Sequence, residues 1–269
     1  MFRTVKAENG VEYLESSLLP GCIHGFSTRK GGASVNEHTS SLNLAFGRGD
    51  AEDTVLKNLS LFADAVGFDP HKLVSVPQIH STDIIEASTE LGGEGIFRNS
   101  GLCGDGYVIS DAGIFAAVKT ADCVPILMYD PQKKIAAAVH AGWRGTFGRI
   151  AEKGVRKMLA LGAEATDIMA AIGPAVNGEC YEVGQDVYLA AAECFSSVPG
   201  AVFTLGRESG KYYCDLKNAN RLILLECGVR AENIDVCTVC THCRTDMFYS
   251  HRASGGKRGT MMSVIGIKL

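Results

Sequence analysis

Short apolar runs alternate along the chain with polar stretches that contain glycine or proline, and this pattern predicts alternating strands and helices. The centre is clearest, because largely apolar runs at 114–118, 124–129 and 134–140 predict strands, the last two joined by a turn at 130–133. We expect further strands at residues 23–28, 73–78, 83–86, 107–110, 168–172, 234–237 and 262–267.

Helices are predicted where apolar residues recur three or four positions apart. Val55, Leu59, Phe62 and Val66 have this spacing and predict a helix at 50–67. Further helices are expected at 146–161, closed by Gly162, and at 185–195 and 216–226. The mixture favours an α/β sandwich with a mixed sheet. Because no linker or internal repeat interrupts the pattern, we expect residues 1–269 to form a single domain.

Composition narrows the class of protein. Apolar residues make up 46% and charged residues 21% of the chain, as in an ordinary globular protein. The formal net charge is −4, so the chain lacks the broad basic face that holds a nucleic-acid backbone. A few arginines in one cleft are still compatible with binding of a small anion such as phosphate.

Ten cysteines need a cellular context before they can be interpreted. The first six residues lack the apolar core of a signal peptide, and Lys119 and Asp122 interrupt the best apolar stretch. We therefore expect a cytoplasmic protein that spans no membrane. Cytoplasmic thiols stay reduced, so metal binding, catalysis or simple burial explains the cysteines better than a disulfide framework.

Three segments place metal-binding or nucleophilic residue types at the ends of predicted strands. They contain His80, Cys123 and His140. Two imidazoles and a thiolate are a suitable set for zinc, and three protein ligands leave a fourth position for water or substrate. No local spacing rule supports the set, and a single histidine or cysteine at a strand end is more often a structural residue.

The surroundings of these residues favour a functional site. Gly142 and Gly145 flank Trp143 and Arg144 where a helix is expected to begin, which permits close backbone approach and favours anions. Asp122 precedes Cys123 and is placed to orient a ligand or a water molecule from outside the coordination sphere.

Other metal and nucleotide motifs are missing from the sequence. It contains no phosphate-binding loop of the Walker A type, no complete G-x-G-x-x-G, no H-E-x-x-H and no zinc deaminase signature. Near the C-terminus, Cys237, Cys240, His242 and Cys243 resemble half of a zinc knuckle. Four ligands within seven residues are cramped for one ion and no second pair follows, so we interpret this cluster as structural or incidental.

The ordered motifs resemble the YfiH-like family of purine nucleoside phosphorylases, formerly described as polyphenol oxidase or laccase domain proteins. The resemblance covers nearly the whole chain. It rests on HGFSTRKGG (24–32), SLNL (41–44), GD (49–50), QIH (78–80), TADC (120–123), HAGWRG (140–145), IGPA (172–175), YEVG (181–184) and FYSHR (248–252).

The resemblance implies a compact α/β/β/α sandwich with His80, Cys123 and His140 as the catalytic residues and metal ligands, with zinc as the metal and copper as an alternative in vitro. It also implies phosphorolysis of adenosine, inosine and methylthioadenosine-type nucleosides, with adenosine deamination as a side activity. One departure is visible. The family reads Gly-Arg-Met where this chain has Gly259-Thr260-Met261, with Arg258 placed before the glycine.

Phosphorolysis needs cationic or polar groups for phosphate, and we predict Arg29, Asn43, Arg144 and Arg252 for this role. Surface ion pairing is the alternative interpretation of each arginine, and we favour it slightly for Arg252. A true laccase needs His-x-His pairs, and the seven histidines of this chain include none. The main alternative is a cysteine hydrolase that acts on an amide, with Cys123 as the nucleophile and His140 as its base. We leave open whether the protein is a monomer or a homodimer.

Overall fold

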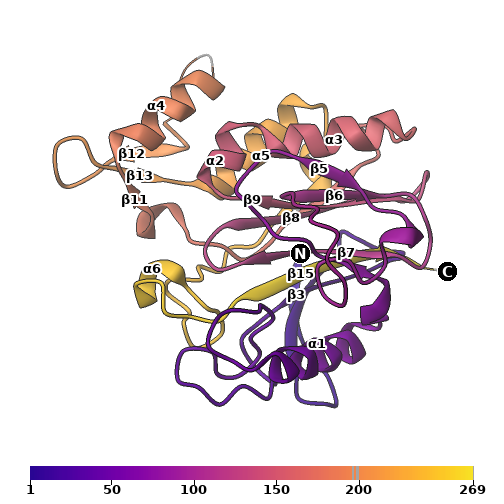
Figure 1. The fold of residues 1–269 in the computed structure, drawn as a ribbon. Helices are drawn as coiled ribbons and strands as arrows, with labels where there is room; N and C mark the ends of the chain where they lie inside the picture. Colours follow the sequence, from indigo (N-terminus) through magenta and orange to yellow (C-terminus); the bar gives the residue numbers. More distant parts are fainter. Residues whose placement is uncertain (196, 198–199, 269) are drawn as a thin grey trace.

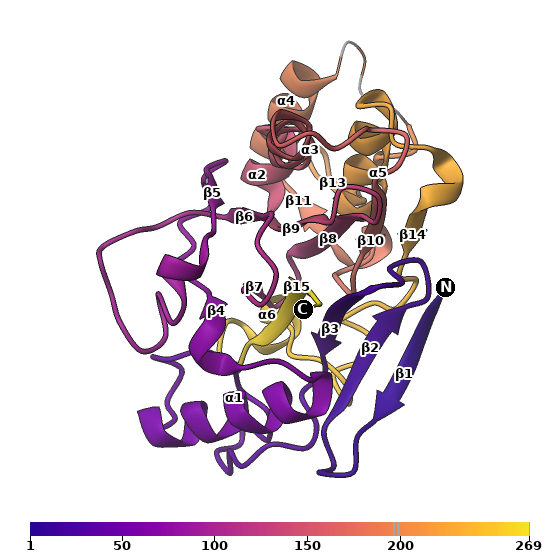
Figure 2. The same cartoon turned by 90° about the vertical axis from the view of Figure 1, so that its right-hand side faces the viewer.

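The predicted α/β/β/α sandwich is confirmed by the computed structural model, which describes residues 1–195, 197 and 200–268. Two six-stranded sheets are stacked face to face, and helices cover the outer face of each (Figures 1 and 2). In the part of the chain that the structure describes, no helix is long and apolar enough to cross a membrane.

The first sheet has the strand order β1-β2-β3-β15-β7-β4. Its neighbours pair antiparallel, except that β4 runs parallel to β7. Its strands are β1 (Phe2–Lys6), β2 (Glu12–Ser16), β3 (Cys22–Ser27), β4 (Leu73–Val74), β7 (Phe115–Thr120) and β15 (Met261–Ile267).

The second sheet has the order β14-β10-β8-β9-β6-β5 and is mixed as well. The pairs β10/β14 and β5/β6 at its two edges are parallel, whereas the central pairs are antiparallel. Its strands are β5 (Ile84–Glu86), β6 (Gly106–Ile109), β8 (Val124–Asp130), β9 (Ile135–Ala141), β10 (Met169–Ile172) and β14 (Ile234–Val236).

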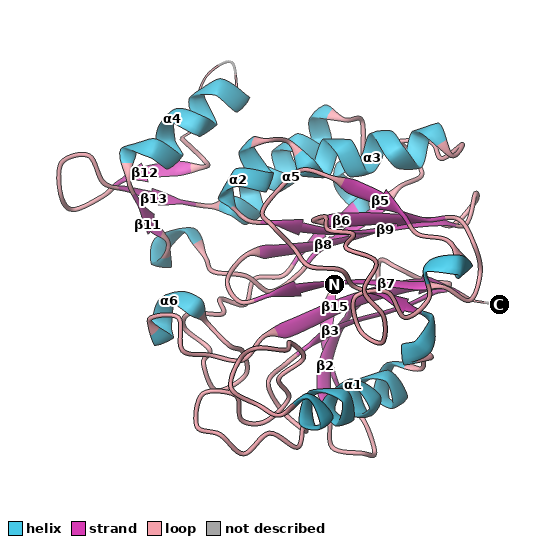
Figure 3. Cartoon of the chain, in the orientation of Figure 1, coloured by secondary structure: helices cyan, strands magenta, loops and turns pink. Residues whose placement is uncertain are grey.

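The helices form the two outer layers, with α1 on the first sheet and α2, α3 and α5 on the second (Figures 1 and 3). A small third sheet, in the order β11-β13-β12, lies beside α4. The bounds are α1 (Glu52–Val66), α2 (Trp143–Phe147), α3 (Ile150–Ala160), α4 (Gln185–Cys194), α5 (Leu216–Glu226), α6 (His251–Ser254), β11 (Glu182–Val183), β12 (Phe203–Leu205) and β13 (Tyr212–Cys214). Four 3-10 turns complete them at Pro70–Lys72, Thr89–Leu91, Gly178–Cys180 and Ala231–Asn233.

The central strands are apolar along their whole length because both faces of each sheet are covered. In β9, Ala137 and Val139 pack into the core under α3, whereas Ala136 and Ala138 pack between the sheets. This alternation follows from the two-residue period of a strand. His140 comes next on the face between the sheets, where a polar side chain needs partners of its own.

The prediction of one helix at 146–161 is wrong. The chain forms α2, then breaks at Gly148 and Arg149 before α3 begins. Arg149 has φ of +60°, a left-handed conformation that stops a helix. Its side chain compensates by pairing with Glu152 and with Glu226, the latter at 2.8 Å.

The predicted strand at 73–78 is shorter than expected. Only β4 forms, because side chains replace the sheet partners of the residues that follow it. The Val76 amide donates to the Tyr107 hydroxyl at 2.7 Å. The Gln78 side chain then bonds both backbone groups of Lys119, with Oε1 accepting at 2.6 Å and Nε2 donating at 2.8 Å. The segment that leads to His80 is therefore tied to β7 through side chains.

Candidate metal centre

The structure brings together the three residues predicted as metal ligands. Cys123 directly precedes β8 and His140 lies near the end of β9, and these strands pair antiparallel with Val124 opposite Ala141. His80 arrives from the loop after β4. One ligand atom from each residue lies within 4.8 Å of the other two. The three residues differ in exposure: His140 is buried, Cys123 is half-buried and His80 is exposed.

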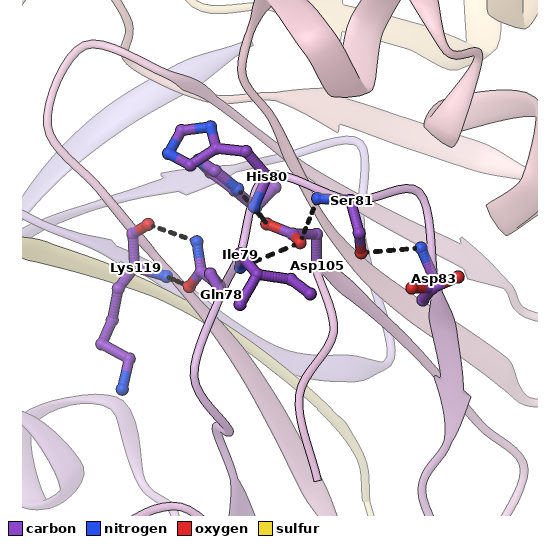
Figure 4. Close-up of polar contacts among 8 residues, drawn as sticks. Gln78, Ile79, His80, Ser81, Asp83, Asp105 and Lys119 are labelled. Carbon is purple, nitrogen blue, oxygen red and sulfur yellow. Dashed lines mark hydrogen bonds and ion pairs between the residues drawn. The ribbon is translucent and has the colours of Figure 1, made fainter.

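Asp105 is the buried group that holds both histidines in place. One carboxylate oxygen lies 2.8 Å from His140 Nδ1, and the carboxylate also accepts the backbone N–H groups of Ile79, His80 and Ser81 at 2.7–3.1 Å (Figure 4). A carboxylate on one histidine nitrogen leaves the other nitrogen free for a metal. The sequence analysis missed Asp105, because nothing near it in the sequence signals this role.

The carboxylate of Asp105 and the imidazole of His140 each stabilise the charged form of the other. Burial alone would raise the pKa of Asp105, but hydrogen bonds from His140 and from the Ser81 amide lower it to about 2. Burial would also lower the pKa of His140, yet hydrogen bonds to Asp105 and Cys123 raise it to about 9. Burial lowers the pKa of His80, and the nearby charge of His140 lowers it further.

Asp122 anchors the turn that carries Cys123. It has a left-handed backbone with φ of +84°, a conformation that costs a non-glycine residue about 1–3 kcal/mol. Its carboxylate accepts the Thr241 hydroxyl at 2.6 Å, the Ser250 hydroxyl at 3.0 Å and the backbone N–H of Arg252 at 2.7 Å. These bonds offset the backbone cost and hold the turn that carries the thiol, and orientation of a ligand or a water molecule by Asp122 stays a prediction.

A glycine is required at position 142 because two of the three candidate ligands, His80 and Cys123, lie against its backbone. A Cβ atom there would lie 2.8 Å from His80 Nδ1 and 3.3 Å from Cys123 Sγ. The glycine therefore leaves space that the ligands need. Two imidazoles and one thiolate in such a cradle fit a zinc ion by donor type and number.

The three ligands line a pocket of about 410 Å³ that also contains two arginines, Arg48 and Arg258. Among the residues that the structure describes, neither arginine forms an ion pair with a carboxylate. Burial and the nearby charge of Arg48 lower the pKa of Arg258. Its Nη1 donates to Thr260 Oγ1 at 2.7 Å, while its buried Nε has no hydrogen-bond partner in the described ranges. The sequence analysis did not assign either arginine to the site.

Two of the residues predicted to bind phosphate are engaged elsewhere. Asn43 is fully buried, where it donates to Asp50 at 2.9 Å and accepts the Thr260 amide at 3.0 Å. Arg29 donates to the Thr245 carbonyl at 2.8 Å and lines a separate hollow. Asn43 therefore supports the wall of the ligand pocket through Thr260, whereas Arg29 lines a different hollow.

The other two predicted arginines are exposed and stack on aromatic rings. Arg144 lies over Trp143 at 4.2 Å from the ring centre, and Arg252 lies over Tyr181 at 5.1 Å. Neither belongs to the lining of the pocket that holds the three ligands. Phosphate binding by Arg29, Asn43, Arg144 and Arg252 stays a prediction.

The Asp105–His140 pair makes the stability of metal-free protein depend on pH. Because the pKa of folded His140 is raised from 6.5 to about 9, its stabilisation is complete below pH 6.5 and is lost as the pH rises through about 9. Because the pKa of Asp105 is lowered from 3.8 to about 2, the stabilisation that Asp105 contributes to the folded state is lost as the pH falls from 3.8 to about 2. Thermal melts of chelated protein should therefore show a Tm that falls between pH 6.5 and 9.

Asp105→Asn is the variant that checks this assignment. The amide removes the charge that raises the pKa of His140, so the fall in Tm between pH 6.5 and 9 should flatten. Zinc affinity should also drop about 10–100-fold, as is typical when the partner of a ligating histidine is lost. Equal pH dependence in the two proteins would show that the pair does not control this range.

Comparison with known proteins adds three kinds of similarity. Residues 23–268 match a family model described as multi-copper polyphenol oxidoreductase laccase. The chain is 34% identical over 251 residues to purine nucleoside phosphorylase YlmD of Bacillus subtilis, covering 91% of this chain and 88% of that one. It is 36% identical over 239 residues to adenosine deaminase RL5 from an unknown prokaryotic organism, covering 88% and 91%. The crystal structure of YfiH from Bacillus licheniformis superposes with a TM-score of 0.91 at 32% identity, covering 98% and 99%.

Proposed function

The chain belongs to the YfiH-like family of purine nucleoside phosphorylase- and adenosine deaminase-like proteins, and from this premise we propose that it is a zinc-dependent purine nucleoside phosphorylase. We propose adenosine, inosine and methylthioadenosine-type nucleosides as substrates, with phosphate as the co-substrate. Adenosine deamination is proposed as a side activity.

One observation carries this proposal: a set of two histidines and a cysteine opens into a pocket that also holds two arginines without carboxylate partners among the described residues. A metal centre beside an anion-binding wall suits a reaction in which phosphate attacks a nucleoside. Of the residues that could bind phosphate, Arg48 and Arg258 have the strongest support from position.

We propose His80, Cys123 and His140 as the ligands of zinc. The chemistry supplied by zinc in such a site is Lewis acidity, which polarises a purine atom or lowers the pKa of a water molecule toward neutrality. Asp105 fixes the orientation of His140, and Gly142 leaves room for the side chains of His80 and Cys123. The chain's own residues thus set the position of the metal against the pocket.

Phosphorolysis assigns distinct tasks to the pocket residues. An oxygen of hydrogen phosphate forms a bond to C1′ of the ribose while the C1′–N9 bond breaks, and the proton of hydrogen phosphate ends on the departing purine. The guanidinium groups of Arg48 and Arg258 hold phosphate through charge-assisted hydrogen bonds and fix the attacking oxygen. The products are the free purine and ribose 1-phosphate.

Organisation and location extend the proposal. Both sheets contribute to the pocket. Cys123 directly precedes β8 and His140 lies on β9 of the second sheet, while Lys119 and Thr120 lie on β7 of the first. This shared wall supports a single domain over residues 1–269. We propose a cytoplasmic protein that acts on small molecules rather than nucleic acid or membranes, as a monomer or homodimer.

A cysteine hydrolase is the second candidate, and one observation favours it. His140 lies between Asp105 and Cys123, which is the order of a triad in which a carboxylate orients the base of a thiol nucleophile. Copper-dependent oxidation fits less well. A laccase needs a cluster of histidines, whereas this centre contains His80 and His140 alone.

Treatment with a chelator, zinc and then a thiol alkylator tests which candidate is correct. For a zinc phosphorylase, we expect chelation to abolish nucleoside turnover and added zinc to restore it. Bound zinc should also protect the Cys123 thiol from alkylation. A protein that keeps full activity without metal but loses it on alkylation would be a cysteine hydrolase.

A further inference from the structure

A second group of metal-ligating residues lies apart from the pocket described above. Cys180 ends the 3-10 turn Gly178–Cys180, while His242 and Cys243 lie in the loop after β14. One ligand atom from each lies within 4.8 Å of the other two, and the sulfurs of Cys180 and Cys243 are 3.3 Å apart. Sixty-two positions separate Cys180 from His242 in the sequence, which is why no motif joins them.

Cys240 would add a third sulfur, and a fourth ligand, to this group. It is buried, accepts the backbone N–H of Asn177 at 3.3 Å, and lies three positions before Cys243 in the chain. A backbone amide that donates to the first sulfur of a Cys-x-x-Cys segment stabilises a thiolate, the form in which cysteine binds a metal.

The imidazole of His242 is incompletely bonded. Its Nδ1 atom is buried and has no hydrogen-bond partner among the residues that the structure describes. A buried polar atom left without a partner costs about 1–3 kcal/mol, so such atoms usually have a function or a missing ligand. Bonding of the imidazole to a metal would remove this deficit.

We propose that Cys180, Cys240, His242 and Cys243 form a second, structural zinc site. Three thiolates and one imidazole are a donor set of closed structural zinc sites. Two thiolates at about 2.3 Å from one tetrahedral ion lie about 3.8 Å apart, so Cys180 and Cys243 need to separate only slightly. Cys237 is excluded from the set, because its buried side chain belongs to the apolar core between the sheets.

The position of the site indicates its role. It joins the turn before Tyr181 to the turn that contains Thr241, whose hydroxyl donates to Asp122. The Val176 amide donates to the Asp122 carbonyl at 3.1 Å from the other side. A zinc ion here would therefore fix both segments that support the turn of Cys123. The site does not depend on the proposed enzymatic function.

Zinc content per chain tests the proposal. Reduced full-length protein is loaded with zinc, freed of loosely bound metal by gel filtration, and analysed for zinc by mass spectrometry. We expect two zinc ions in the wild type and in Cys103→Ser, an exposed cysteine outside both groups. One ion is expected in Cys123→Ser and one in Cys243→Ser, while the double variant should hold none.

Cobalt substitution keeps the test informative if a variant folds poorly. Because the second site has three thiolates and the first has one, thiolate-to-cobalt absorbance per bound ion should be stronger in Cys123→Ser than in Cys243→Ser. Wild-type protein should show the sum of both spectra.

Three results would overturn the second site. They are a Cys123→Ser protein without zinc, a Cys243→Ser protein with the same zinc content as the wild type, or a Cys180–Cys243 disulfide in the intact mass of freshly purified protein. By contrast, if Cys123→Ser keeps two zinc ions and Cys243→Ser loses one, the assignment of Cys123 as a ligand in the pocket would be wrong, and the second site would be supported.

Discussion

Replacement of Cys123 by serine is expected to abolish nucleoside turnover and to remove zinc from the pocket. Serine is a poor ligand for zinc, so two imidazoles would remain to hold the ion. Loss of an outer partner already costs about 10–100-fold in affinity or activity, and loss of a ligand should cost more. Steady-state turnover and zinc content measured on the same sample check both effects.

The Cys123→Ser protein also separates the two candidate mechanisms. Its fold should survive, because the thiol is half-buried and serine has nearly the same shape. In a zinc enzyme, turnover and pocket zinc disappear together, and Cys103→Ser keeps both. A variant that retains pocket zinc but loses activity would show that the sulfur acts as a nucleophile rather than as a ligand.

Replacement of Arg258 by methionine is expected to impair phosphorolysis while sparing deamination. Methionine keeps the apolar stem of the side chain but removes a charge that faces the pocket. A hydrogen bond to a charged group contributes about 1.5–3 kcal/mol, which corresponds to a fall of about 10–150-fold in kcat/KM for phosphate. Deamination uses water instead of phosphate, so inosine formation should change little.

Arg252→Met is the matched control. Arg252 is exposed and stacks on Tyr181 outside the pocket lining, and only its backbone N–H contacts Asp122. We expect its KM for phosphate to stay within about threefold of the wild type, as befits an exposed side chain outside the site. A larger loss in Arg252→Met than in Arg258→Met would move the phosphate site to Arg252, one of the four residues predicted from the sequence to bind phosphate.

The sequence predicted the parts of the fold that depend on apolar pattern. The strands β7, β8 and β9 and the helices α1 and α5 lie within a few residues of their predicted positions, because each buries a regular apolar set. The N-terminal strands β1 and β2 were missed. β1 is an edge strand whose side chains are largely exposed, so its pattern resembles that of a loop.

The three candidate metal ligands could be named from sequence because their motifs resemble a known family, but the residues that contact them could not. Asp105 meets His140 across 35 positions of the sequence through the β6/β9 pairing. Arg258, which lies two positions before the place of the arginine in the family pattern, still lines the pocket. Cys180 joins the second cysteine cluster through a turn that no local pattern connects to it. Contacts of this kind arise only when segments far apart in the sequence are brought together by the fold.

Product analysis with adenosine, in the presence and absence of phosphate, tests the proposed function most directly. Zinc-loaded protein should convert adenosine to adenine and ribose 1-phosphate only when phosphate is present, with some inosine in both reactions. Chelated protein should form no adenine, no ribose 1-phosphate and no inosine. Zinc-loaded protein that leaves adenosine unchanged while it hydrolyses an amide substrate would contradict the assignment as a phosphorylase.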